Sequence, residues 1–246
     1  MTPTVSPELD LKRIKVLYEI AERRFLKSLP LEHFMESTPQ ATQRAITLAS
    51  FALVQVSRPD VQCFNELLVQ YPRAGQDADR PGQVVPDNMV VIHPRPIVAE
   101  GSYMTPLQPV GPFLVLEYVS KASAHKDEET SYTKYEKELR VPYYLLFYPD
   151  GDEFTLFRLG EKGYTSVVPN ALGRCPIPEL ELEVGQLGRW VRYWFRGELL
   201  PLPGDLLKER DEARRQLDAE RQARQAAEAE LAKLREELAR AKSQSE

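Results

Sequence analysis

The sequence predicts a mixed α/β (α+β) fold, in which helices flank a central mixed β-sheet and a long helix forms the C-terminal end. Two helical patterns near the N-terminus, several short apolar runs in the middle and a change of composition at Asp205 support this prediction. We expect three parts: an N-terminal helical segment over 1–29, an α/β domain over 30–204 and a charged helical tail over 205–246.

The first elements are two helices followed by two strands. Leu9–Leu29 has a helical pattern, and Pro39–Val56 predicts a second helix with Thr38 as its N-cap. Cys63–Tyr71 and Val84–Ile92 each have the composition of a strand.

A strand–helix–strand unit follows a proline-rich stretch. Phe113–Val119 is an apolar run, Lys121–Leu139 is polar and helical in character, and Val141–Tyr148 is rich in β-branched and aromatic residues. This order predicts two parallel strands joined by a right-handed crossover. Gly160 and Gly163 then predict a β-hairpin turn between two further short strands.

An aromatic and basic cluster closes the α/β part. Its spacing favours an amphipathic helix packed on the core over a platform on which nucleic-acid bases stack. The aromatic members are Trp190, Tyr193, Trp194 and Phe195.

The tail from Asp205 to Glu246 contains no glycine, proline or aromatic residue. Its ten Lys/Arg and eleven Asp/Glu residues are interspersed, as in a solvated helix about 60 Å long. A heptad frame is apolar at most of its core positions and is most regular from Ala227 to Ala241. It passes through Leu206, Arg210, Ala213, Leu217, Glu220, Arg224, Ala227, Leu231, Leu234, Leu238 and Ala241. A single solvated helix and a self-associating coiled coil both fit this pattern, and we expect a homo-oligomer, a dimer, formed through the tail.

Composition excludes several classes of protein. The net charge of −5 provides no general basic surface for nucleic acid, so DNA contact needs a local patch. The two cysteines do not form a disulfide or zinc pattern. No leader or membrane span is apparent, and we expect a cytoplasmic protein without membrane contact. The common nucleotide-binding and hydrolase motifs are absent.

Glu117 is the most informative residue, because it lies at the centre of the apolar run Phe113–Val119. An ionised carboxylate in a buried strand is costly unless a cation, a metal or hydrogen bonds compensate it. Asp87 lies near the start of the preceding candidate strand. Two strands that bring these carboxylates to a common edge would form a site for a hard cation.

Three segments resemble the Uma2 family of bacterial endonucleases (DUF820), which belongs to the PD-(D/E)XK nuclease superfamily. They are Val85-Pro-Asp-Asn-Met-Val-Val91, Leu114-Val-Leu-Glu-Tyr-Val-Ser-Lys-Ala-Ser123 and Val141-Pro-Tyr-Tyr-Leu-Leu-Phe147. The resemblance spans roughly residues 30 to 200. It implies a restriction-endonuclease-like sheet, a PD-(D/E)XK nuclease-like domain over 30–204 and DNA as the partner.

The resemblance also implies a metal site. Asp87 and Glu117 would bind Mg²⁺ or Mn²⁺, and Glu36 and Glu66 could add outer ligands. The family lysine falls at Ser131 in this chain, so the catalytic cation is assigned to Lys121, with Lys134 as the alternative.

Three hypotheses follow. The chain is an active metal-dependent DNA endonuclease, a nuclease-fold binding module that has lost catalysis, or an interaction protein that assembles through its tail. Cleavage assays separate the first two hypotheses, and removal of the tail tests the third.

Overall fold

A computed structural model describes residues 7–29, 37–77, 79–119, 131–148 and 153–243 of the chain. It divides into two compact units, 1–200 and 201–246. In these described ranges, no helix is both long enough and apolar enough to cross a membrane.

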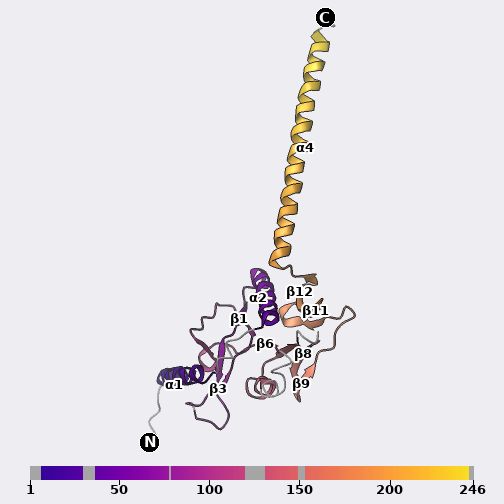
Figure 1. Cartoon of the computed structure of the whole chain (residues 1–246). Coiled ribbons are helices and arrows are strands. Elements are labelled where there is room, and N and C mark those ends of the chain that lie inside the picture. Colours follow the sequence, from indigo (N-terminus) through magenta and orange to yellow (C-terminus); the bar gives the residue numbers. More distant parts are fainter. Residues whose placement is uncertain (1–6, 30–36, 78, 120–130, 149–152, 244–246) are drawn as a thin grey trace. The chain divides into compact units, whose positions relative to one another are not determined.

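The elements follow one another along the chain as shown in Figure 1. They are α1 (Pro7–Ser28), α2 (Thr38–Ser57), β1 (Val61–Asn65), β2 (Leu68–Tyr71), β3 (Gly82–Val84), β4 (Asn88–Ile92), β5 (Ser102–Met104), η2 (Thr105–Leu107), β6 (Leu114–Tyr118), η3 (Lys134–Glu138), β7 (Tyr143–Tyr148), β8 (Glu153–Gly160), β9 (Gly163–Ser166), β10 (Cys175–Ile177), η4 (Pro178–Leu180), β11 (Leu182–Leu187), β12 (Trp190–Phe195), β13 (Glu198–Leu199) and α4 (Pro203–Ser243).

The central element of the first unit is a six-stranded sheet with the order β1-β4-β6-β7-β8-β9. Strands β6 and β7 run parallel, and the other neighbours are antiparallel. The predicted mixed α/β fold with a long C-terminal helix is therefore confirmed, as are the parallel strand pair and the hairpin of β8 and β9.

The central sheet is covered on both faces. Helix α2 packs against β1 (Figure 1), and Thr47 Oγ1 of α2 hydrogen-bonds Tyr118 Oη of β6 at 2.6 Å. On the other face, side chains such as Val115 and Tyr144 join a buried cluster with Val69 and Tyr103 of a small sheet ordered β3-β2-β5. Alternation along β6 directs Glu117 toward this second face, together with Val115.

A third sheet, ordered β10-β11-β12-β13, corrects one prediction. Trp190–Phe195 is strand β12 rather than an amphipathic helix. All six of its residues pair with β11, and Gly188 and Gly197 adopt positive φ angles of 64° and 86° just outside the strand. These two turns confine the segment to one strand length, and burial by α2 and β11 accounts for its apolar content.

Three further boundaries differ from prediction. The N-cap of α2 is Ser37 rather than Thr38, because Ser37 and Gln40 form a reciprocal capping box. The predicted strand Cys63–Tyr71 is two strands, broken at Glu66, which has a left-handed φ of 46°. Val84–Ile92 is also divided, and its halves β3 and β4 belong to different sheets. Pro86 lies at this second break, where its missing N–H interrupts strand pairing.

The segment before β7 is described only from residue 131. It is helical there and ends in the π-helical turn η3. The rest of the predicted helix, from residue 121 to 130, lies outside the described residues.

Candidate functional site

Three acidic residues occupy one row across neighbouring strands. Asn88 of β4 pairs with Leu116 of β6, so the next step of the same antiparallel register places Asp87 opposite Glu117. The register between β1 and β4 places Glu66 opposite Asp87 in the same way. Residues opposite each other on paired strands have Cβ atoms about 5 Å apart. Sheet topology therefore brings the Asp87 and Glu117 side chains together, whereas Glu66 lies just past the end of β1 with a left-handed φ of 46°.

Asp87 and Glu117 contact each other directly. A hydrogen bond between the two side chains contributes to the electrostatics of both groups. Asp87 Oδ2 also accepts a hydrogen bond of 2.7 Å from the main-chain N–H of Tyr118. Both acidic residues are half-buried. Strand β6 therefore contacts Asp87 twice, through the side chain of Glu117 and through the main-chain N–H of Tyr118.

A buried tyrosine fixes the second carboxylate. Tyr135 is fully buried, and its hydroxyl donates a hydrogen bond of 2.5 Å to Glu117 Oε1. Tyr135 belongs to the π-helical turn η3, and such turns are frequent at functional sites. Sequence reasoning gave no role to the Tyr135 hydroxyl.

The electrostatics of the pair favour a bound cation. Burial raises the pKa of Asp87 to about 6, although the Tyr118 N–H and the positive charge of Arg44 act in the opposite direction. Burial raises the pKa of Glu117 well above its ordinary value, and the negative charge of Asp87 raises it further. The hydrogen bond from Tyr135 only partly opposes this rise. Two ionised carboxylates are therefore unfavourable here unless a positive charge joins them.

Arg44 of α2 provides a positive charge beside this row. It is 9% exposed and forms an ion pair with Glu66. On the same face of α2, Gln40 Nε2 donates to the carbonyl of Tyr118 at 2.7 Å, and Thr47 contacts the Tyr118 hydroxyl. Positions 40, 44 and 47 are neighbours on a helix surface, so Arg44 faces the end of β6 that carries the carboxylate pair. Sequence reasoning missed Arg44, because helical spacing shows which residues share a face but not which strand that face meets.

The lysines proposed from sequence are placed differently. Lys121 lies outside the described residues, as does Glu36. Lys134, at the start of η3, donates a hydrogen bond of 3.0 Å to the carbonyl of Gln83 in β3. Ser131 is half-buried in the helical segment just before η3.

The carboxylate pair fits a magnesium-type ion better than a softer metal. Among the described residues, no three His, Cys, Asp or Glu side chains come together in a metal-binding group. Magnesium usually needs only one or two protein carboxylates, since waters and substrate phosphates complete its coordination. Asp87 and Glu117 offer such a pair of oxygen donors, whereas Glu66 is engaged with Arg44.

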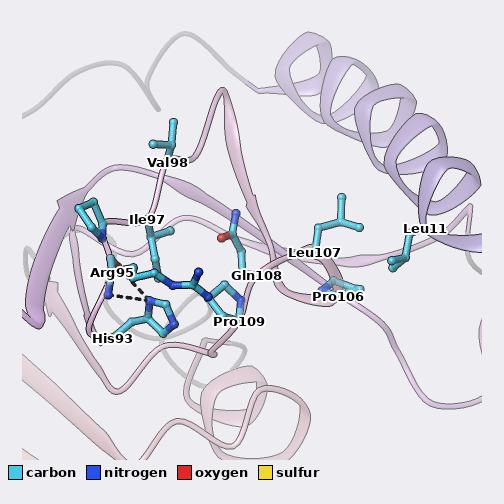
Figure 2. A pocket seen from close by; sticks show the side chains of 10 residues that line it. Leu11, His93, Arg95, Ile97, Val98, Pro106, Leu107, Gln108 and Pro109 are labelled. Atoms are coloured by element: carbon cyan, nitrogen blue, oxygen red, sulfur yellow. Dashed lines mark hydrogen bonds between the residues drawn. The ribbon is translucent and has the colours of Figure 1, made fainter. Parts of the chain in front are cut away.

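A separate hollow of about 570 Å³ lies beyond the opposite end of β4. Figure 2 shows His93 and Arg95 close together in its lining, where His93 Nδ1 contacts the Arg95 main chain. Neither Asp87 nor Glu117 lines it. Asp87 directly precedes β4 and His93 directly follows it, so the length of this strand separates the hollow from the carboxylate pair.

Comparison with known proteins identifies a family and similar chains of solved structures. Residues 32–187 match the Uma2 family model, which is described as "Putative restriction endonuclease". No curated protein matches the chain. The crystal structure of a protein from Anabaena variabilis ATCC 29413, described as a "putative nuclease belonging to DUF820", is similar with a TM-score of 0.44 and 16% sequence identity. The similarity covers 59% of this chain and 75% of that one.

Proposed function

This chain belongs to the Uma2 family, and from that premise we propose that it is a metal-dependent endonuclease that hydrolyses DNA phosphodiester bonds. The observation that carries the proposal is the contact between Asp87 and Glu117 at one edge of the central sheet. An acidic pair of this kind has no evident structural use, because burial makes its double ionisation unfavourable.

Asp87 and Glu117 would hold Mg²⁺ or Mn²⁺. When bound, such an ion polarises the phosphate and lowers the pKa of a water molecule. In the overall hydrolysis, water oxygen bonds to phosphorus and the bond from phosphorus to one sugar oxygen breaks. One proton of the water ends on the leaving oxygen and the other passes to solvent, which leaves a phosphomonoester and a hydroxyl.

Two hydrogen bonds from the protein orient the carboxylates of the pair. The Tyr118 N–H binds Asp87 Oδ2 and the Tyr135 hydroxyl binds Glu117 Oε1. One oxygen of each carboxylate is thereby oriented. Because both pKa values are raised, cation binding should release protons from the pair.

Cleavage of a labelled DNA duplex in Mg²⁺ or Mn²⁺ tests the proposal. We expect Asp87→Ala and Glu117→Ala each to reduce the cleavage rate by about 100-fold or more, because a metal ligand is lost. Glu198→Ala, which removes an exposed acid of β13, is the matched control and should cleave as wild type does.

Cleavage that persists in both site variants would show that the reaction occurs elsewhere. A wild-type protein that binds DNA and metal but cleaves no duplex would instead favour the hypothesis of a binding module without catalysis.

A further inference from the structure

The acidic pair poses an electrostatic problem for a phosphodiester substrate. Asp87, Glu117 and the substrate phosphate are all anionic, and one divalent ion can offset only two of these charges. Nucleases and other phosphoryl-transfer sites commonly place a protein cation on the phosphate for this reason. The chain therefore needs a basic side chain at the same end of the sheet.

Helix α2 places Arg44 at that end. Gln40 and Thr47, on either side of it along one helix face, both contact Tyr118, the neighbour of Glu117. The partner of Arg44 is Glu66, whose main-chain N–H in turn donates to the carbonyl of Asp87 at 3.2 Å. Arg44 is thus linked to Asp87 through Glu66, and its neighbours on the same helix face contact the residue that follows Glu117.

We propose that Arg44 is a catalytic residue that contacts the scissile phosphate of the substrate beside the Asp87–Glu117 pair. This inference rests on the proposed endonuclease function and assigns a further residue to the same site. A guanidinium suits the role because it remains charged and its planar fork can bind two phosphate oxygens at once.

The Arg44–Glu66 ion pair is poorly explained as a device for stability alone. The side chain of Glu66 is 57% exposed, whereas that of Arg44 is 11% exposed. Ion pairs with such an exposed partner contribute little to stability. Glu66 also adopts a left-handed φ of 46°, a strained conformation that concentrates at functional sites. An acid at the rim that orients a more buried arginine toward an adjacent ligand site accounts for both features.

Steady-state cleavage of a labelled duplex in Mn²⁺, with DNA varied to separate kcat from KM, tests the role of Arg44. We expect Arg44→Met to lower kcat about 100-fold, as loss of one transition-state donor does. Arg44→Lys retains the charge but not the fork and should lose less. The rise in Tm caused by Mn²⁺ should remain in Arg44→Met, because Asp87 and Glu117 are intact.

Two further variants separate catalysis from structure. Glu66→Gln removes the ion pair that orients Arg44 but keeps the guanidinium, and should lower kcat clearly less than Arg44→Met does. Arg58→Met is the matched control, since Arg58 ends the same helix and pairs with Asp60. We expect it to cleave as wild type does.

Several results would overturn the inference. Arg44→Met with kcat within about threefold of wild type excludes contact with the phosphate. Glu66→Gln as impaired as Arg44→Met shows that only the ion pair matters. If Arg44→Met does not fold by circular dichroism, equal rates for Arg44→Lys and Arg44→Gln overturn it, and a faster Arg44→Lys supports it. A wild-type protein without cleavage removes the proposed endonuclease function, and this inference with it.

Discussion

Asp87 and Glu117 lie in surroundings that disfavour their ionised forms. Burial raises the pKa of both carboxyl groups, and the charge on Asp87 adds to the rise at Glu117. The Tyr118 N–H and the Tyr135 hydroxyl stabilise the charged forms, but not enough to restore ordinary pKa values. Sites that bind a cation commonly accept such a cost in stability, because the ligand relieves it.

This cost predicts that Asp87→Asn stabilises the metal-free protein at high pH. The pKa of Asp87 rises from 3.8 to about 6 on folding, so the unfolded chain loses its proton first as pH increases. Stability falls across this window and stays low above it. As pH rises from 4 to 8, the unfolding free energy of Asp87→Asn should increase relative to that of wild type by roughly 1–2 kcal/mol. This figure is reduced because the Asp87 side chain is partly exposed. Urea denaturation in a chelator measures the gain.

Asp60→Asn should change the stability of the protein in the opposite direction to Asp87→Asn. Asp60 pairs with Arg58, and this hydrogen bond lowers its pKa on folding. Its contribution to stability is present at neutral pH and is lost as pH falls through the lowered pKa. Asp60→Asn should therefore destabilise the protein at pH 8 and have little effect at the lowest pH. An Asp87→Asn variant no more stable than wild type at pH 8 would contradict the electrostatic account of the site.

Helix α2 links the site to the third sheet. Its residues Gln40, Arg44 and Thr47 meet the end of β6 or the acidic row, while Gln43 reaches β12. The Gln43 side chain donates to the carbonyl of Val191 at 3.0 Å and accepts from its N–H at 2.8 Å. A side-chain amide thus replaces a neighbouring strand along this part of β12.

Gln43→Leu should reveal the strength of that link. Gln43 is fully buried, so leucine fits the surroundings chemically but leaves the two main-chain groups of Val191 without partners. Unpaired buried polar groups cost about 1–3 kcal/mol each. We expect a loss of roughly 2–4 kcal/mol in unfolding free energy, measured by urea denaturation. Gln76→Leu, at an exposed loop position, is the control, and a loss in Gln43→Leu no greater than in this control would refute the link.

Helix α4 belongs to the second unit and carries exposed leucines. Leu217, Leu231 and Leu234 are 47–56% exposed along it, and they occupy heptad positions of the frame proposed from sequence. A highly charged helix with exposed leucines at heptad positions is typical of a helix that forms a coiled coil. The dimer expected from the sequence stays a prediction.

Truncation after Pro203 tests this assembly. We expect the full chain to have the mass of a dimer and the truncated chain that of a monomer, as measured by sedimentation or light scattering. Leu231→Lys should weaken the dimer, because it places a charge in the seam, whereas Ala232→Lys, one position outside the frame, should not. An unchanged mass after truncation would remove the assembly role of α4.

Local sequence was sufficient for much of the architecture. The mixed fold, the parallel pair of β6 and β7, the hairpin and the long C-terminal helix follow from hydrophobic periodicity and turn residues, which act over a few neighbouring positions. Glu117 stood out for the same reason, because one carboxylate in an apolar run is a local anomaly. The Uma2 family was also recognised from three short segments in order.

Other features depended on partners far apart in the chain. Trp190–Phe195 is a strand because β11 pairs with it and α2 buries it, and its own spacing resembled a helix. Strand register decides that Asp87 lies opposite Glu117, and helix packing decides that Arg44 pairs with Glu66 beside Asp87. Periodicity in a single chain reports which face of an element is apolar, but not which element lies opposite. The acidic residue Glu117 was therefore readable from the sequence, whereas the basic residue we assign beside it became visible only in the packed molecule.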